Sequence, residues 1–170
     1  ILRSEQKKFL ENLSQRTDIN TGTLKDIRRL SMQISARNQI SGIVELITNG
    51  TVNAEVYIKL KSGYTIVSVI TNTAVSNLNL KLGDEVVAIF KSNTVLITTD
   101  ISLNISARNK LQGKVDSINK GEINSELIID IGNGDKVASI ITSNSIDNLK
   151  IKEGAQVSAI IKASDVMIGK

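Results

Sequence analysis

The stretch SARNQISGIVELI, residues 35–47, is repeated as SARNKLQGKVDSI at residues 106–118, a shift of 71 positions. With this shift the sequence aligns with itself without a gap over residues 35–99 and 106–170, and 25 of the 65 aligned positions are identical. Unrelated segments would agree at roughly one position in fifteen to twenty, given average residue usage. Self-similarity at a fixed period is typical of duplicated modules. The sequence therefore predicts two copies of one domain, joined by a short connector.

Each copy shows the alternation of apolar and polar residues that indicates β-strands. Aromatic residues make up only 2% of the chain, so the core must be aliphatic, and β-branched residues favour strands. Five strands with a short helix after the third is the order of an OB-type barrel. The expected strands are 40–48, 54–60, 65–71, 85–90 and 94–98 in the first copy and 111–118, 125–131, 136–142, 156–161 and 165–168 in the second, with helical residues within 72–80 and a turn at 143–149.

Residues 1–34 have no counterpart in the repeat and show the spacing of helices. Apolar residues of the segment 2–13 fall on one side of a predicted helix, and Thr23 opens a second one in a capping-box pattern. We expect a helical linker or dimerisation arm and, because the chain begins without Met, the joint to an upstream domain. The expected fold is all-β: two tandem five-stranded OB-like barrels preceded by a short N-terminal helical segment.

Cysteine and histidine are both absent, which excludes several kinds of site. Disulfides, thiolate nucleophiles, the usual zinc ligands and the commonest general base cannot be present. No apolar run reaches the roughly 18 residues that span a bilayer, and the start has no signal-peptide pattern, so we expect a cytoplasmic protein without membrane contact. The net charge of +4 suits an anionic ligand but is too small to indicate a nucleic-acid partner.

Four polar residues recur at the ends of the predicted strands in both copies. Arg and Lys supply charge and donors, Ser and Thr supply neutral donors, and one Arg with one Lys balances a tetrahedral dianion. The alternative is structural, because a lone cation at a strand end is usually solvated and Ser and Thr there often form turns. Their retention at identical spacing favours an oxyanion site. The residues are Ser35, Arg37, Thr71 and Lys91, and then Ser106, Arg108, Thr142 and Lys162.

Three motifs together resemble a known family. Ser-Ala-Arg-Asn before an Ile-Ser-Gly-Ile strand is followed by Ile-Thr-x-x-Ala-x-x-x-Leu-x-Leu-x-x-Gly-Asp-Glu-Val and then by Lys-Ser-x-x-Val-x-Ile. This pattern resembles the molybdenum-pterin-binding (Mop) module, which is related to the transport-associated OB (TOBE) domains. Two such modules behind a helical segment resemble the C-terminal half of molybdate-dependent transcriptional regulators of the ModE type. The resemblance covers essentially the whole chain.

The resemblance implies a homodimer whose sites lie between chains and take molybdate or tungstate, without a cofactor or a free metal cation. One chain would supply the Ser-Ala-Arg segment, and the other would supply the Thr and the Lys-Ser pair. The family pattern also has a Ser three residues after the Thr, which the second copy has as Ser145, whereas the first copy has Ala74. We expect both copies to bind. The implied oxyanion-binding residues are Ser35, Ala36, Arg37, Thr71, Lys91, Ser92, Ser106, Ala107, Arg108, Thr142, Ser145 and Lys162.

The function implied is that of a molybdate sensor module in a transcriptional regulator, which would contact DNA only through an N-terminal winged-helix domain absent from this chain. One alternative is an intracellular molybdate storage protein of the molbindin type. A second is an OB-fold nucleic-acid binder, but such proteins stack bases on aromatic residues, and the second copy has none. A third is an enzyme with a Ser–Lys pair, but no His, Cys or clustered carboxylates accompany it. We therefore expect no catalysis.

Overall fold

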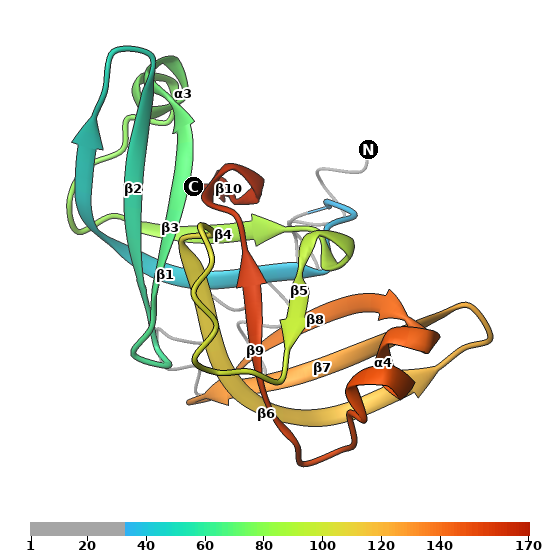
Figure 1. Ribbon diagram of the computed structural model, residues 1–170. Coiled ribbons are helices and arrows are strands. Elements are labelled where there is room, and N and C mark those ends of the chain that lie inside the picture. The colour runs from blue at the N-terminus through green and yellow to red at the C-terminus, as the bar shows by residue number, and fades with distance from the viewer. Residues whose placement is uncertain (1–32) are drawn as a thin grey trace, which may run out of the picture. The chain divides into compact units, whose positions relative to one another are not determined.

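The computed structural model describes residues 33–170 and places the two repeats in two five-stranded antiparallel sheets (Figure 1). Residues 36–170 form one compact unit, and residues 33–35 belong to a separate N-terminal unit. The helices expected within 1–34 lie outside the described residues. The first repeat comprises β1 (Asn38–Asn49), β2 (Asn53–Leu60), β3 (Thr65–Thr71), α3 (Asn72–Asn77), β4 (Glu85–Phe90), the 3-10 helix η1 (Ser92–Thr94) and β5 (Leu96–Thr98). The second comprises β6 (Asn109–Lys120), β7 (Asn124–Gly132), β8 (Asp135–Thr142), α4 (Ser143–Leu149), β9 (Gln156–Ile161), η2 (Ala163–Asp165) and β10 (Met167–Gly169).

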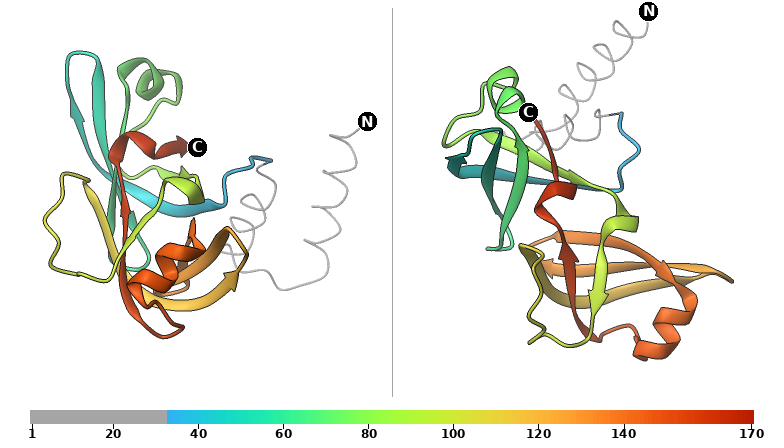
Figure 2. Two further views of the ribbon diagram at one scale, coloured as in Figure 1. Left: turned by 45° about the vertical axis from the view of Figure 1, so that its right-hand side comes forward. Right: turned by 45° about the horizontal axis from the view of Figure 1, so that its top comes forward.

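The fifth strand of each repeat pairs with the sheet of the other repeat. The last strand of the chain, β10, pairs with β4, and β5 pairs with β9. The strand orders are therefore β10-β4-β1-β2-β3, called barrel 1 below, and β5-β9-β6-β7-β8, called barrel 2. Figure 2 shows the C-terminal segment of the chain, in red, reaching the blue and green strands of barrel 1. The sequence predicted five strands in each copy and their order along the chain, but it did not predict this exchange.

Helices are short throughout the described residues. The segment 143–149, which was expected as a turn, forms the helix α4, and the equivalent α3 is one residue shorter. The fifth strands begin later than expected, because 3-10 helices occupy the residues before them. Between residues 33 and 170 no helix is both long and apolar enough to cross a membrane.

Two glycines let the first strand of each repeat lie unusually close to the strand that pairs with it. A Cβ atom added at Gly42 would lie 2.5 Å from the nearest atom of β2, and one added at Gly113 would lie 2.3 Å from the nearest atom of β7. Only glycine allows the backbones to approach this closely. A β-bulge follows each glycine, between Val44 and Leu46 in β1 and between Val115 and Ser117 in β6. Glycines and bulges together give a strand the curvature that a barrel needs.

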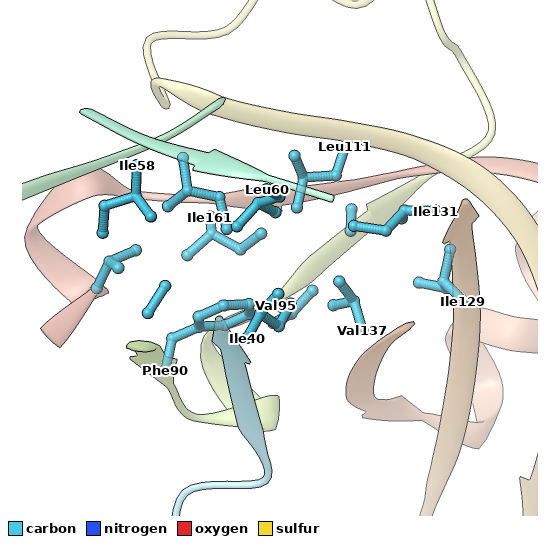
Figure 3. Close-up of a cluster of buried hydrophobic side chains, with 14 of the residues drawn as sticks. Ile40, Ile58, Leu60, Phe90, Val95, Leu111, Ile129, Ile131, Val137 and Ile161 are labelled. Carbon is cyan, nitrogen blue, oxygen red and sulfur yellow. The ribbon is translucent and has the colours of Figure 1, made fainter. Parts of the chain in front are cut away.

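One aliphatic core runs through both barrels (Figure 3). Alternate residues of β2 and β7 point into it, and Phe90 is its only aromatic member among the buried side chains. The strand exchange adds residues to this core, because Val95 and Val166, which precede the exchanged strands, are each 1% exposed. Since a barrel of this size alone is marginally stable, the shared core ties the folding of each barrel to that of the other.

Two asparagine side chains join the barrels through the edge strands β3 and β8. Asn109 Nδ2 donates to the carbonyl of Val67 at 2.9 Å, and its Oδ1 accepts from the Val67 N–H at 2.7 Å. Asn38 makes the same two hydrogen bonds with Ala138, at 2.8 and 2.7 Å. An edge strand has backbone groups that lack a neighbouring strand, and a side-chain amide can supply both the donor and the acceptor. Hydrogen bonds from Ser68 to the Val166 carbonyl and from Ser139 to the Val95 carbonyl extend the junction.

Replacing Asn109 by Ala should destabilise the protein strongly. The change leaves the N–H and the carbonyl of the buried Val67 without partners, and each unsatisfied buried group costs about 1–3 kcal/mol. We expect the free energy of unfolding, measured by urea denaturation, to fall by about 2–4 kcal/mol. The exposed Asn104, replaced by Ala, is the control and should change it by less than about 0.5 kcal/mol. Equal stability of the two variants would rule out this role for Asn109.

A methyl group at Gly42 should also be poorly tolerated. The added Cβ overlaps β2, so the strands must separate, and overpacking of this kind costs about 1–3 kcal/mol. Thermal unfolding of Gly42→Ala measures the effect, with Ser41→Ala on the same strand as the control. A melting temperature of Gly42→Ala at or above that of the control would show that β1 does not need the close approach.

Candidate functional site

The strand ends of each barrel bring an arginine and a lysine together. Asn38, the first residue of β1, pairs with Phe90, the last residue of β4. Arg37, which precedes β1, and Lys91, which follows β4, are therefore at neighbouring strand ends. Their backbone positions are therefore neighbours within one chain. The family resemblance implied that the arginine and the lysine of one site come from different chains, and this stays a prediction. The same register holds in barrel 2, where Asn109 opposite Ile161 leads to Arg108 and Lys162.

The two lysines have exposed side chains that are available to a ligand. Within residues 33–170, neither the Lys91 nor the Lys162 ammonium group makes a hydrogen bond or an ion pair. Other lysines of the second repeat do pair, such as Lys136 with Asp116 at 2.8 Å. An ammonium group is a compact charge with three donors, so each of these lysines can bind an anion directly.

The two threonines cap short helices at the ends of β3 and β8. The hydroxyl of Thr71 accepts a hydrogen bond from the N–H of Ala74 at 3.1 Å and keeps its own proton for another acceptor. Thr142 accepts in the same way from Ser145 at 3.1 Å, and the two hydroxyls lie 2.7 Å apart, so one donates to the other. The N-terminus of α4 thus has the hydroxyl pair of Thr142 and Ser145, whereas the equivalent positions at α3 are Thr71 and Ala74.

Both arginines form ion pairs with a glutamate of the other repeat. Arg37 donates from both Nη atoms to the two carboxylate oxygens of Glu126, at 2.8 and 2.9 Å. Arg108 donates to Glu55 at 2.7 Å and to the hydroxyl of Tyr57 at 3.1 Å. The hydrogen bond that Arg108 donates to Tyr57 and the negative charge of Glu55 raise the pKa of Arg108 above its usual value. Each arginine is therefore fixed to the partner repeat within the same chain.

These ion pairs hold each arginine on the strand that pairs with the threonine-bearing strand of the other repeat. Glu55, which binds Arg108, lies opposite Val69 on β3, and Thr71 is the next residue of β3 on the same face. The 3-10 helix η2, which directly follows Lys162, also packs against β3. The arginine and lysine of the second repeat thus lie at the strand that carries the threonine of the first.

The internal symmetry produces a second arrangement of the same kind. Glu126 lies opposite Ile140 on β8, the next residue on that face is Thr142, and η1 packs against β8. We name the two arrangements after their arginines. From this register we assign Ser106, Ala107, Arg108, Lys162, Thr71 and Ala74 to the Arg108 cluster, and Ala36, Arg37, Lys91, Ser92, Thr142 and Ser145 to the Arg37 cluster.

The remaining predicted residues differ in exposure. Ser35 is the exposed last residue of the N-terminal unit and is not placed relative to either cluster. Ala36 and Ser92 are each only 6% exposed, so a ligand would reach the backbone N–H of Ala36 more easily than a side chain there. Ser106 is exposed, and Ala163 occupies the position equivalent to Ser92 in the second repeat.

The glutamates change the charge balance expected from the sequence. One Arg and one Lys were expected to balance a dianion, but the Arg-bound carboxylate of Glu55 or Glu126 leaves each cluster with a net charge of +1 from these three groups. The sequence analysis missed both glutamates, although they occupy equivalent positions and are identical in the two repeats. Among residues 33–170 no group of three or more acidic side chains is placed to hold a metal cation.

Comparisons with known proteins agree with the repeat. A family model of the TOBE domain matches residues 34–97 and 105–168. The chain is 37% identical to the molybdenum transport protein ModE of Azotobacter vinelandii over 98% of its length, and 32% identical to the transcriptional regulator ModE of Yersinia pestis over 99%. It spans 64% of the length of each of these two relatives.

A solved structure is similar to most of the described fold. The cytoplasmic molybdate-binding protein ModG, with molybdate bound, superposes with a TM-score of 0.78 at 42% sequence identity. The match covers 81% of this chain and 99% of the ModG chain. The tandem arrangement of two modules is therefore shared at the level of structure as well as sequence.

The Arg37–Glu126 pair should contribute modestly to stability. The two side chains are 54% and 25% exposed, and exposed ion pairs couple by about 0.2–1 kcal/mol. A double-mutant cycle of Arg37→Ala and Glu126→Ala, measured by urea denaturation, should give a value in the upper part of this range, because the geometry is bidentate. The pair of Lys120 with Asp147, which is monodentate and more exposed, is the control and should couple less. A larger coupling for the control pair would contradict the argument.

Proposed function

The chain belongs to the TOBE domain family, with one copy of the domain in each half, and on this premise we propose that it binds the tetrahedral oxyanion molybdate, or tungstate. In this proposal it is the ligand-sensing module of a molybdate-responsive transcriptional regulator and carries out no catalysis. The names of its relatives, a molybdenum transport protein and a transcriptional regulator, support this role. The cytoplasmic location stated for ModG supports the same location here.

One observation carries the proposal: strand ends of the two repeats bear an exposed lysine with no ion pair among residues 33–170, an arginine fixed by a glutamate, and a threonine whose hydroxyl caps a helix. A tetrahedral oxyanion has only acceptors, and it requires charged and neutral donors arranged around it. Lys91 and Lys162 supply the uncompensated charge, and Thr71 and Thr142 supply hydroxyl donors. The proposed ligand contacts are those predicted from the sequence, Ser35, Ala36, Arg37, Thr71, Lys91, Ser92, Ser106, Ala107, Arg108, Thr142, Ser145 and Lys162.

We further propose that the chain acts as a homodimer and that a second copy completes the sites. Each cluster has a net charge of +1 from its arginine, glutamate and lysine, which does not balance a dianion. Its lysine and threonine are also exposed, whereas tight binding of a dianion needs shielding from water and matched charge. Donors from a second copy would supply both. Ligand binding would then stabilise the dimer by mass action.

Regulation of transcription requires a DNA-binding part, which we propose to be a winged-helix domain preceding residue 1. The two copies of the sensor would then set how two such domains are presented to DNA. A second candidate function is molybdate storage or buffering, because the similar ModG structure is accounted for almost entirely by the region that matches this chain. Both functions use the same oxyanion sites.

Loss of a cluster lysine should weaken molybdate binding. A hydrogen bond to a charged group contributes about 1.5–3 kcal/mol, so Lys91→Ala or Lys162→Ala should lower the affinity of the affected site about tenfold to a hundredfold. Calorimetric titration with molybdate, tungstate and sulfate measures this. Lys152→Ala, at an exposed lysine between α4 and β9, is the control and should bind like the wild type. Unchanged binding in Lys91→Ala, Lys162→Ala and their double variant would refute the oxyanion clusters.

A further inference from the structure

One aromatic side chain distinguishes the Arg108 cluster from the Arg37 cluster. Tyr57 on β2 occupies the position that Ile128 occupies on β7. The glutamate two residues earlier is the same in both repeats, and each glutamate binds the arginine of the other repeat. The phenol is therefore a polar group that one proposed site has beside its arginine and the other lacks.

Tyr57 closes a network of three side chains. Its hydroxyl donates to Glu55 Oε2 at 2.9 Å and accepts from Arg108 Nη2 at 3.1 Å, while Arg108 Nη1 donates to Glu55 Oε1 at 2.7 Å. The guanidinium carbon also lies 6.0 Å from the centre of the Tyr57 ring, at the outer limit of a cation–π contact. The Arg37 guanidinium, in contrast, is held by Glu126 alone among the described residues. Arg108 is thus fixed by two residues of β2 and Arg37 by one residue of β7.

We propose that Tyr57 is a positioning residue that strengthens oxyanion binding at the Arg108 cluster. This inference rests on the function proposed above. A long side chain that becomes ordered only when the ligand binds opposes association, and one that is already ordered does not. By holding Arg108 through both Nη atoms, Tyr57 and Glu55 keep the guanidinium on β2 before the anion arrives. The guanidinium keeps further N–H groups for the ligand, because these contacts use only one N–H of each Nη atom.

The same network offsets a shortage of hydroxyl donors. The Arg108 cluster has Ala74 and Ala163 at the positions where the Arg37 cluster has Ser145 and Ser92. With fewer neutral donors, the Arg108 cluster depends more on its charged groups. Fixing the guanidinium in advance therefore raises the affinity for the anion more at this cluster than it would at the other.

The experiment compares two proteins in which the Arg37 cluster is weakened, so that the Arg108 cluster binds first. The first carries Lys91→Ala, and the second carries Lys91→Ala with Tyr57→Phe, which keeps the ring and removes the hydroxyl. In calorimetric titration with molybdate, the dissociation constant of the second protein should be roughly two- to tenfold higher, the range expected for ordering one long side chain. Lys91→Ala with Tyr64→Phe is the matched control, because the Tyr64 hydroxyl donates to the Gln112 carbonyl, outside both clusters.

A spectroscopic measurement tests the same contact without altering Tyr57. The chain has two tyrosines and no tryptophan, so the emission of a Tyr64→Phe variant comes chiefly from Tyr57. Molybdate should change this emission saturably, and the change should persist with Lys91→Ala and disappear with Lys162→Ala. The emission of a tyrosine with only a structural role would not change with the occupancy of one site.

The outcomes separate this inference from the proposed function. An unchanged dissociation constant in the Tyr57→Phe protein would overturn the role of Tyr57 and leave the oxyanion function in place. If the Tyr57→Phe protein fails to fold, the emission of the Tyr64→Phe variant tests the role of Tyr57 instead. An emission that does not respond to molybdate would overturn that role. A chain with natural residues at all these positions that binds neither molybdate nor tungstate would overturn the proposed function itself.

Discussion

The amide side chains of Asn38 and Asn109 hold the two barrels in register, and the rest of the structure depends on this contact. Each amide satisfies one N–H and one carbonyl of an edge strand, the groups that would otherwise face the other barrel without partners. Both side chains are almost fully buried, at 2% and 1% exposure, so any displacement would leave several polar groups unsatisfied inside the protein. The exchanged strands β5 and β10 and the shared core join the same two barrels.

The position of the candidate sites follows from the same asparagines. Each asparagine is the first residue of its strand and directly follows the arginine of the Ser-Ala-Arg-Asn motif, so fixing the amide on the edge strand also fixes where the arginine leaves the backbone. That arginine reaches the glutamate of the other repeat, on the strand that pairs with the same edge strand. A motif of four residues therefore combines a structural anchor with a proposed ligand group.

Much of the fold could be predicted from the sequence because strand alternation and turn glycines are local signals. The duplication added a strong constraint, since each predicted strand had to recur 71 residues later. The exchange of β5 and β10 could not be predicted, because two repeats with the same strand pattern offer each fifth strand two equivalent partners, its own sheet and the sheet of the other repeat. The arginines, lysines and threonines were recognised by their chemistry, which suits an anion. Glu55 and Glu126 were not predicted, because a carboxylate repels an anion and only the structure shows that each one binds an arginine.

The exchange also determines which parts of the molecule can respond to a ligand. The barrels share a core and hold each other's fifth strands, so neither can rotate or separate without exposing buried apolar surface such as Phe90 and Val95. A bound anion gains its free energy from exposed groups, the lysine ammonium and the threonine hydroxyl, which lie at the surface of this rigid pair. A ligand shifts only those equilibria in which its contacts differ between states. Within one chain the two barrels keep a single arrangement, and in the dimer proposed above the contact between chains would therefore be the equilibrium on which an anion at these clusters acts.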